Sequence, residues 1–116
     1  MSSKTALTQG TIVLNESIEV WAKEFILDRK VRNLSPGTIR FYRQKLKLFL
    51  DWCSSQVISN FNQLNPNNLR HYLIYLEDTG HNKGGIHAGY RALKAFLNWW
   101  EDEFEPENWS NPIQKK

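Results

Sequence analysis

Cysteine is almost absent from this sequence, since Cys53 is the only one in 116 residues. A single cysteine forms no disulfide within the chain and supplies no cysteine-rich zinc site, which excludes disulfide-stabilised scaffolds and zinc fingers. No apolar run approaches the ~18 residues of a membrane-spanning helix, and residues 1–10 lack the apolar stretch of a signal peptide. We therefore expect a cytoplasmic protein with no membrane partner.

The residues that commonly carry catalysis or bind metals do not group along the chain. His71, His81 and His87 are not spaced three or four residues apart, and no acid completes a ligand set. Gly84-Gly85 is not followed by the lysine–hydroxyl pair of a phosphate-binding loop. Cys53 falls among apolar residues, where a buried, unreactive thiol is expected. We therefore predict no cofactor, no metal ion and no enzymatic activity.

Acidic residues are missing from a long central stretch of the chain. Between Arg29 and Leu50 there are seven basic residues and no acid, whereas residues 101–107 include five acids and no base. The net charge is only +3, but its uneven distribution predicts one basic face and one acidic end. Such a face indicates an anionic partner, and nucleic acid is the leading candidate.

Four helical patterns follow one another along the chain. Apolar residues recur at helical spacing over residues 15–31, 36–54 and 66–79, and from residue 83 or 84 to residue 103. Ser35 and Asn65 each precede a proline, which is typical of an N-cap followed by the first helical residue. Asn15 can cap the first helix, and Gly80 ends the third. The β-prone run Thr11–Leu14 has no strand to pair with, so the sequence predicts an all-α fold, a compact orthogonal four-helix bundle.

The expected domain covers residues 15–113. Residues 1–14 are interpreted as a flexible lead-in. Residues 105–116 include Pro106 and Pro112 and are expected to be irregular or linker-like, and residues 114–116 are expected to begin a linker.

The second and fourth predicted helices each expose a stripe that contains several cations. On a helical wheel the polar stripe of the second helix consists of Arg40, Arg43, Gln44, Lys47 and Asp51. Phe41 and Lys45 fall within the apolar arc, and we expect Lys45 to extend its ammonium group outward. The stripe of the fourth helix is basic first and acidic later, and it consists of His87, Arg91, Lys94, Asn98, Glu101 and Asp102.

These residue types are the ones that bind DNA. Arg and Lys neutralise phosphates, Arg can also bind guanine, and Gln can bind adenine. A hydroxyl at a helix N-terminus can bind a phosphate oxygen. The candidate DNA-binding residues are Ser35, Thr38, Arg40, Arg43, Gln44, Lys47, Lys83, His87, Arg91 and Lys94. The alternative interpretation of each stripe is an ordinary solvated helix face.

The segment Leu34–Leu50 resembles the second helix of the core-binding domain of tyrosine recombinases, also called phage integrases. The resemblance is carried by Ser35, Thr38 and Tyr42, followed by aliphatic residues and Phe49 on the buried face. Residues 64–73 resemble the third helix of that domain, and residues 83–100 resemble the fourth. Asn111-Pro112-Ile113 is similar to the point where the domain joins the catalytic domain.

This resemblance implies a SAM-like four-helix domain that forms one half of a C-shaped clamp around double-stranded DNA, with the second and fourth helices facing the duplex. The nucleophilic tyrosine would belong to a catalytic domain absent from this chain, so the chain itself is expected neither to cut nor to join DNA. The parent protein would be bacterial or phage-encoded, associated with the nucleoid, and oligomeric on DNA. The isolated domain is expected to be a monomer.

A helical protein–protein interaction module with no role in DNA binding is the alternative function. In that case Trp99, Trp109 and the acidic residues 101–107 would form the interface, and the basic stripes would only aid solubility. This alternative predicts a stable dimer without salt-sensitive affinity for DNA.

Overall fold

The computed structural model describes residues 16–113, and this part of the chain contains four α-helices and one short 3-10 helix. The α-helices are α2 (Ile18–Val31), α3 (Pro36–Ser55), α4 (Pro66–Asp78) and α5 (Lys83–Phe104), and the 3-10 helix is η1 (Phe61–Gln63). The predicted all-α, four-helix fold is confirmed. The predicted lead-in 1–14, the Asn15 cap, the Thr11–Leu14 run and the linker start 114–116 lie outside the described residues.

Side chains that hydrogen-bond free backbone amides fix where the helices begin. The Oγ of Ser35 accepts a hydrogen bond from the backbone N–H of Thr38 at 3.1 Å, and Asn65 and Asn68 cap each other reciprocally at the start of α4. Helix α2 begins three residues later than the sequence predicts, because Ser17 is its N-cap. Gly80 follows the C-cap of α4 with a φ of 98°, a conformation that a residue with a side chain rarely adopts.

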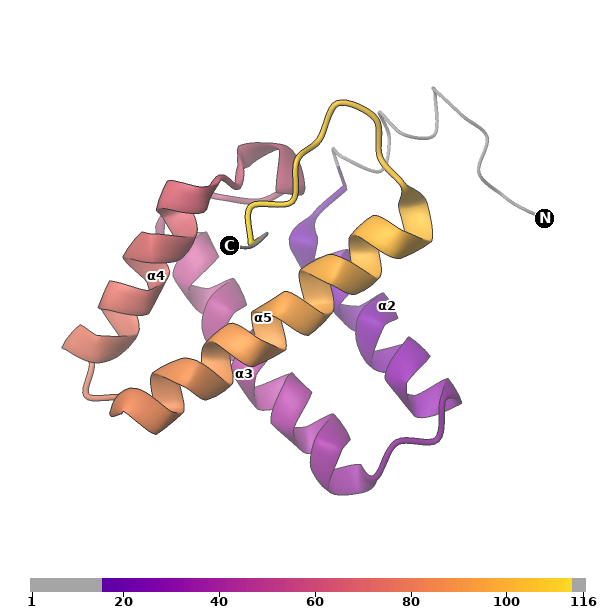
Figure 1. The fold of residues 1–116 in the computed structure, drawn as a ribbon, viewed down its shortest axis with the longest axis horizontal. Coiled ribbons are helices and arrows are strands. Elements are labelled where there is room, and N and C mark those ends of the chain that lie inside the picture. Colours follow the sequence, from indigo (N-terminus) through magenta and orange to yellow (C-terminus); the bar gives the residue numbers. More distant parts are fainter. Residues whose placement is uncertain (1–15, 114–116) are drawn as a thin grey trace.

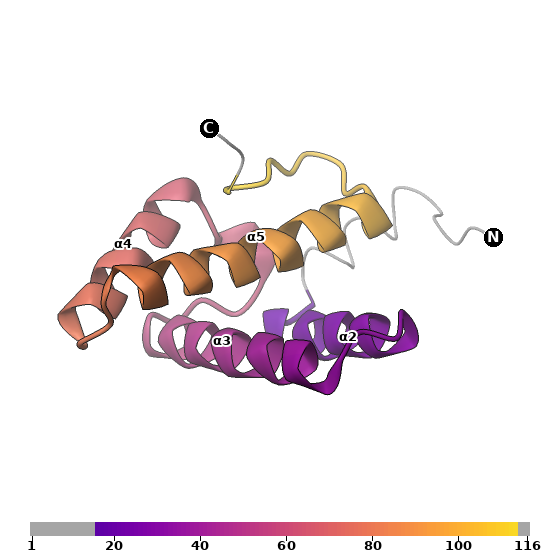
Figure 2. The same ribbon diagram turned by 60° about the horizontal axis from the view of Figure 1, so that its bottom comes forward.

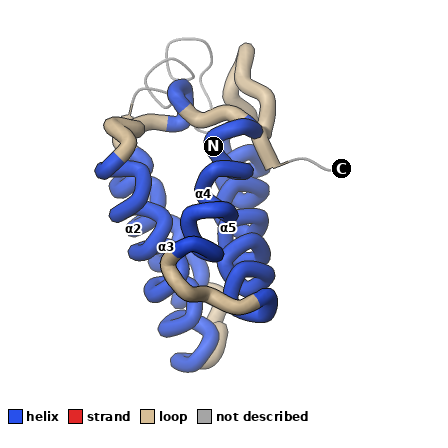
Figure 3. The backbone as a smooth tube through the Cα atoms, turned by 90° about the vertical axis from the view of Figure 1, so that its left-hand side faces the viewer, coloured by secondary structure: helices blue, strands red, loops and turns tan. Residues whose placement is uncertain are grey.

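The helices form two layers. Helices α2 and α3 lie in one layer, and α5 passes across both of them in the other (Figures 1 and 2). Helix α4 lies beside the first half of α5, as Figure 3 also shows. A glycine permits this close approach, because a Cβ atom on Gly89 would lie 3.1 Å from the Cδ1 of Leu76 in α4. Helix α5 is therefore the central element, in contact with each of the other three helices.

Aromatic rings dominate the core between these layers. Phe25, Phe96 and Trp100 are fully buried, and the ring centroids of Phe25 and Phe96 are 5.4 Å apart. Helix η1 was not predicted from the sequence, and it inserts Phe61 against Trp100 with their ring centroids 4.2 Å apart. Each fully buried aromatic side chain contributes about 1.5–3 kcal/mol relative to an exposed one. This core therefore fixes how α5 crosses α2 and α3.

The segment after α5 is irregular, as predicted, but it is not a linker. The ring of Trp109 packs edge-on against Trp100 with the centroids 4.7 Å apart, and its Nε1–H donates to the backbone carbonyl of Phe61 at 3.2 Å. Asn111, Pro112 and Ile113 are buried. Of the two predicted alternatives, irregular or linker-like, the first holds up to Ile113, because apolar burial and side-chain hydrogen bonds keep this segment against α5.

Candidate nucleic-acid interface

The N-terminus of α3 presents two hydroxyl groups close to solvent. Ser35 is exposed and Thr38 is partly exposed. The Ser35 hydroxyl accepts from the Thr38 backbone N–H and donates to Thr38 Oγ1 at 3.0 Å, so Ser35 is engaged as the helix cap. This arrangement leaves the proton of the Thr38 hydroxyl available to a ligand. Thr38 is therefore the better placed of the two to donate to a phosphate oxygen.

The solvent face of α3 carries the polar stripe that the sequence predicts. Arg40, Arg43, Gln44 and Lys47 are all exposed. Arg43 and Lys47 border a groove between α2 and α3, whose floor includes Leu46 and Leu50. Lys47 pairs with Asp51 at 3.1 Å, an exposed i,i+4 ion pair that partly offsets its charge.

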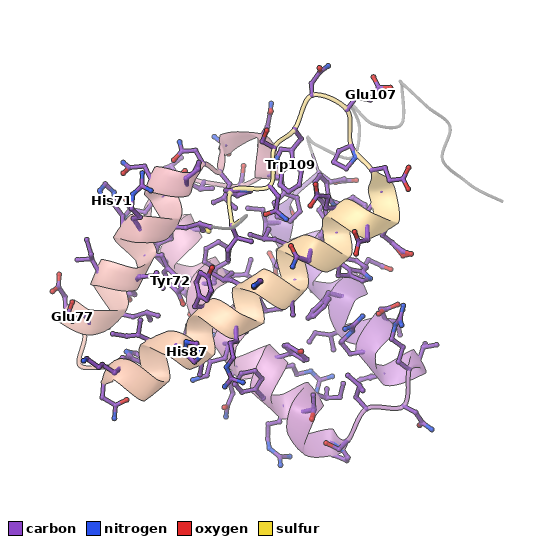
Figure 4. All side chains as sticks on the ribbon, in the orientation of Figure 1. His71, Tyr72, Glu77, His87, Glu107 and Trp109 are labelled. Atoms are coloured by element: carbon purple, nitrogen blue, oxygen red, sulfur yellow. The ribbon has the colours of Figure 1, made fainter. Side chains whose placement is uncertain are left out.

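The first half of α5 carries the second group of candidates. Lys83, His87, Arg91 and Lys94 are exposed, and Figure 4 labels His87 on this part of the helix. Arg91 reaches α3, where its Cζ lies 5.6 Å from the ring centroid of Phe41. The other three have no such contact with α3 among the described residues.

The two stripes belong to different layers, and α5 crosses α3 near Arg91 (Figure 2). At this crossing the Nζ of Lys45 lies 6.0 Å from the same Phe41 ring, so a cation from each helix lies near one aromatic side chain. On the helical wheel Phe41 and Lys45 fall in the apolar arc, so neither was predicted to bind DNA. Their i,i+4 spacing on one helix was a signal that could have paired them, but nothing in the sequence placed Arg91 beside them.

Two of the three basic residues near the end of α2, Arg29 and Arg32, are paired with an acid. Asp28 pairs with both Arg29 and Arg32, and the Cζ of Arg29 lies 4.8 Å from the ring centroid of Phe25. Burial alone would raise the pKa of Asp28, but the hydrogen bonds and charges of the two arginines hold that pKa below its ordinary value. The unpaired part of the basic run is therefore concentrated on α3.

The two tryptophans of the alternative interface lie within the fold. Trp99 is partly buried and contacts Phe25 at 5.5 Å between ring centroids, while Trp109 packs on Trp100 and Phe61. The acidic end of α5 lies close to the basic end of α2, since Asp102 and Glu103 line the same hollow as Arg29 and Arg32. Neither feature presents the free apolar surface that an obligate dimer requires.

Cys53 is a free and buried cysteine. Burial raises the pKa of the Cys53 thiol to about 12, so this cysteine is a poor nucleophile. Over residues 16–113, no group of three or more His, Cys, Asp or Glu residues could hold a metal ion. None of the described helices is long and apolar enough to cross a membrane.

The comparisons with known proteins agree with this architecture. The family model described as "Phage integrase, N-terminal SAM-like domain" matches residues 23–104. No curated protein matches the chain. The crystal structure of the N-terminal domain of a phage integrase/site-specific recombinase from Haloarcula marismortui superposes with a TM-score of 0.70 at 19% identity, covering 84% of this chain and 97% of that one. That likeness supports the fold alone. The family model spans most of the sequence, and the chain belongs to the phage integrase N-terminal SAM-like domains, a family that in general binds DNA.

Proposed function

We propose that this chain is the DNA-binding module of a tyrosine recombinase. The module binds duplex DNA as one half of a clamp during site-specific recombination such as DNA integration. The module supplies no catalytic residue. A catalytic domain of the same protein carries the nucleophilic tyrosine and closes on the duplex from the other side. Family membership and the position of the exposed cations support this proposal.

The solvent face of α3 is the observation that carries the proposal. Arg40 and Arg43 are exposed and form no ion pair with an acid among the described residues. Cations that lack an acidic partner are free to displace counterions from DNA phosphates, and this displacement supplies most of the sequence-independent affinity. Thr38 and Gln44 on the same helix add a hydroxyl and an amide for hydrogen bonds to phosphates or base edges. The acidic second half of α5 would face away from the duplex.

The first experiment is an NMR titration of the isotope-labelled chain with a mixed-sequence duplex of ~20 base pairs at low and then moderate salt. We expect amide shifts to cluster in residues 35–47 and 83–94 and to diminish as salt rises. No shifts even at low salt would contradict DNA binding by this chain. Concentration-dependent shifts around Trp99 and Trp109 without DNA would instead favour the protein-interaction alternative.

A matched pair of charge reversals tests whether the face is assigned correctly. Arg40→Glu changes the α3 face, and Arg70→Glu makes the same charge change at an exposed position on α4. Helix α4 begins at the other end of the molecule from the start of α3 (Figure 1). We expect Arg40→Glu to weaken binding about 10-fold or more and to reduce the slope of log affinity against log salt by about 0.9. Arg70→Glu should change the affinity by no more than about 2-fold. Equal losses in both variants would show that only net charge matters.

A further inference from the structure

Phe41 is an aromatic residue that the buried core does not use. Its side chain is partly exposed, and it is not among the partly buried residues that pack against the core cluster of the described chain. Its ring contacts Tyr42, the next residue, with the centroids 5.5 Å apart. Two cations also lie near the ring, since Arg91 Cζ is 5.6 Å and Lys45 Nζ 6.0 Å from the ring centroid.

These two cations also differ from the paired cations elsewhere on the molecule. Within residues 16–113, Lys47 pairs with Asp51, whereas neither Lys45 nor Arg91 forms an ion pair with an acid. Their charges come from different helices, and both lie near one ring where α5 crosses α3. Two neighbouring cations without acidic partners can bind anionic groups that are regularly spaced, such as the phosphates of a nucleic-acid strand.

We propose that Phe41 is a positioning residue that holds Lys45 and Arg91 together as a two-cation site for the phosphates of one DNA strand at the α3–α5 crossing. This proposal rests on the function proposed above and adds a specific place of contact. The negative face of the ring attracts both cations. A guanidinium that stacks on a ring keeps its edge N–H groups free to donate to phosphate oxygens.

The Phe41 ring increases the affinity for DNA by restricting the Lys45 and Arg91 side chains before the DNA binds. Free lysine and arginine side chains lose rotamer entropy when a phosphate immobilises them. A side chain already restricted by a ring loses less of that entropy on binding. Removing the ring should therefore weaken DNA binding without removing a charge, so the salt dependence of binding should hardly change.

Phe41→Leu and Phe41→Tyr provide the test, because the first removes the ring and the second keeps it. We expect Phe41→Leu to weaken binding to a ~20-base-pair duplex about 3- to 5-fold with an unchanged salt slope. Phe41→Tyr should bind within about 2-fold of the wild-type chain. Circular dichroism and the dispersion of core amide signals report whether each variant remains folded.

Arg91→Gln separates a positioning role from a direct contact. This variant should lower the salt slope by about 0.9, because it removes one cation–phosphate contact. Combined with Phe41→Leu, it should cost less than the sum of the two single losses, since Phe41 acts partly through Arg91. In the free protein, the Nε–Hε signal of Arg91 should be shifted by the ring current, and this shift should disappear in Phe41→Leu but not in Phe41→Tyr.

The outcomes distinguish this proposal from the broader one. If Arg40→Glu weakens DNA binding while Phe41→Leu does not, the positioning role is wrong and the DNA-binding function stands. Additive losses in the double variant, or an Arg91 signal insensitive to the ring, would also overturn the positioning role. If the wild-type chain binds no DNA, both proposals fail.

Discussion

Replacing Asn111 with alanine is expected to lower the free energy of unfolding by about 3 kcal/mol. Asn111 is 6% exposed, and its side chain ties the last described segment to α5. Its Nδ2 donates to Asn98 Oδ1 at 2.9 Å and to Glu101 Oε1 at 3.0 Å, and its Oδ1 accepts from the backbone N–H of Ile113 at 3.0 Å. One side chain therefore satisfies three polar groups.

The magnitude follows from the groups that the substitution leaves behind. The N–H of Ile113 would be buried without a partner, which costs about 1–3 kcal/mol. The lost hydrogen bond to the Glu101 carboxylate adds about 1 kcal/mol, since that partly exposed group can be rehydrated. Asn111→Asp keeps the acceptor for Ile113 but places a second carboxylate against Glu101. We expect its loss at neutral pH to exceed that of the alanine variant and to shrink as the pH falls.

Urea unfolding followed by tryptophan fluorescence measures these losses, because Trp109 packs on Trp100. Asn67→Ala is the matched control, since Asn67 is exposed and its side chain forms no hydrogen bond among the described residues. It should change stability by less than about 0.5 kcal/mol. If Asn111→Ala also costs less than about 0.5 kcal/mol, the segment is not held in the way described here. A loss accompanied by a lower m-value would indicate that the segment detaches before the helices unfold.

Three further predictions concern stability and reactivity. Ser35→Ala should lower the free energy of unfolding by about 1 kcal/mol by removing the α3 cap, as thermal unfolding would show, whereas an unchanged midpoint would contradict the capping role. Gly80→Ala should cost about 1–2 kcal/mol in urea unfolding from backbone strain alone, because no other atom lies within 4 Å of the added Cβ; a neutral result would mean that the turn relaxes. Cys53 should not react with a disulfide reagent at pH 8 until the chain unfolds, and rapid reaction in the native state would refute its burial. Burial raises the pKa of this thiol from 9.0 to about 12, so the folded chain binds the thiol proton more tightly than the unfolded chain does. The stability that this preference contributes is complete below pH 9.0 and should be lost as the pH rises toward 12.

Local rules determined most of the secondary structure. A Ser–Pro or Asn–Pro pair sets where a helix begins through hydrogen bonds within one turn, so the starts of α3 and α4 could be predicted directly. Apolar spacing likewise predicted the buried side of α3, including Ile39, Leu46 and Phe49. The same helical period predicted the exposure of the seven candidates on the two stripes, which are Arg40, Arg43, Gln44, Lys47, His87, Arg91 and Lys94.

Contacts between distant parts of the chain decided the rest. The insertion of Phe61 beside Trp100 and the attachment of Asn111 to α5 depend on how the layers pack, which no local pattern specifies. The same holds for the site around Phe41, because Arg91 reaches that ring only after α5 has crossed α3. The sequence by itself determined which side chains are cationic and exposed. Only the tertiary structure decided which of them meet, since a crossing of two helices depends on the shape of the whole core between them.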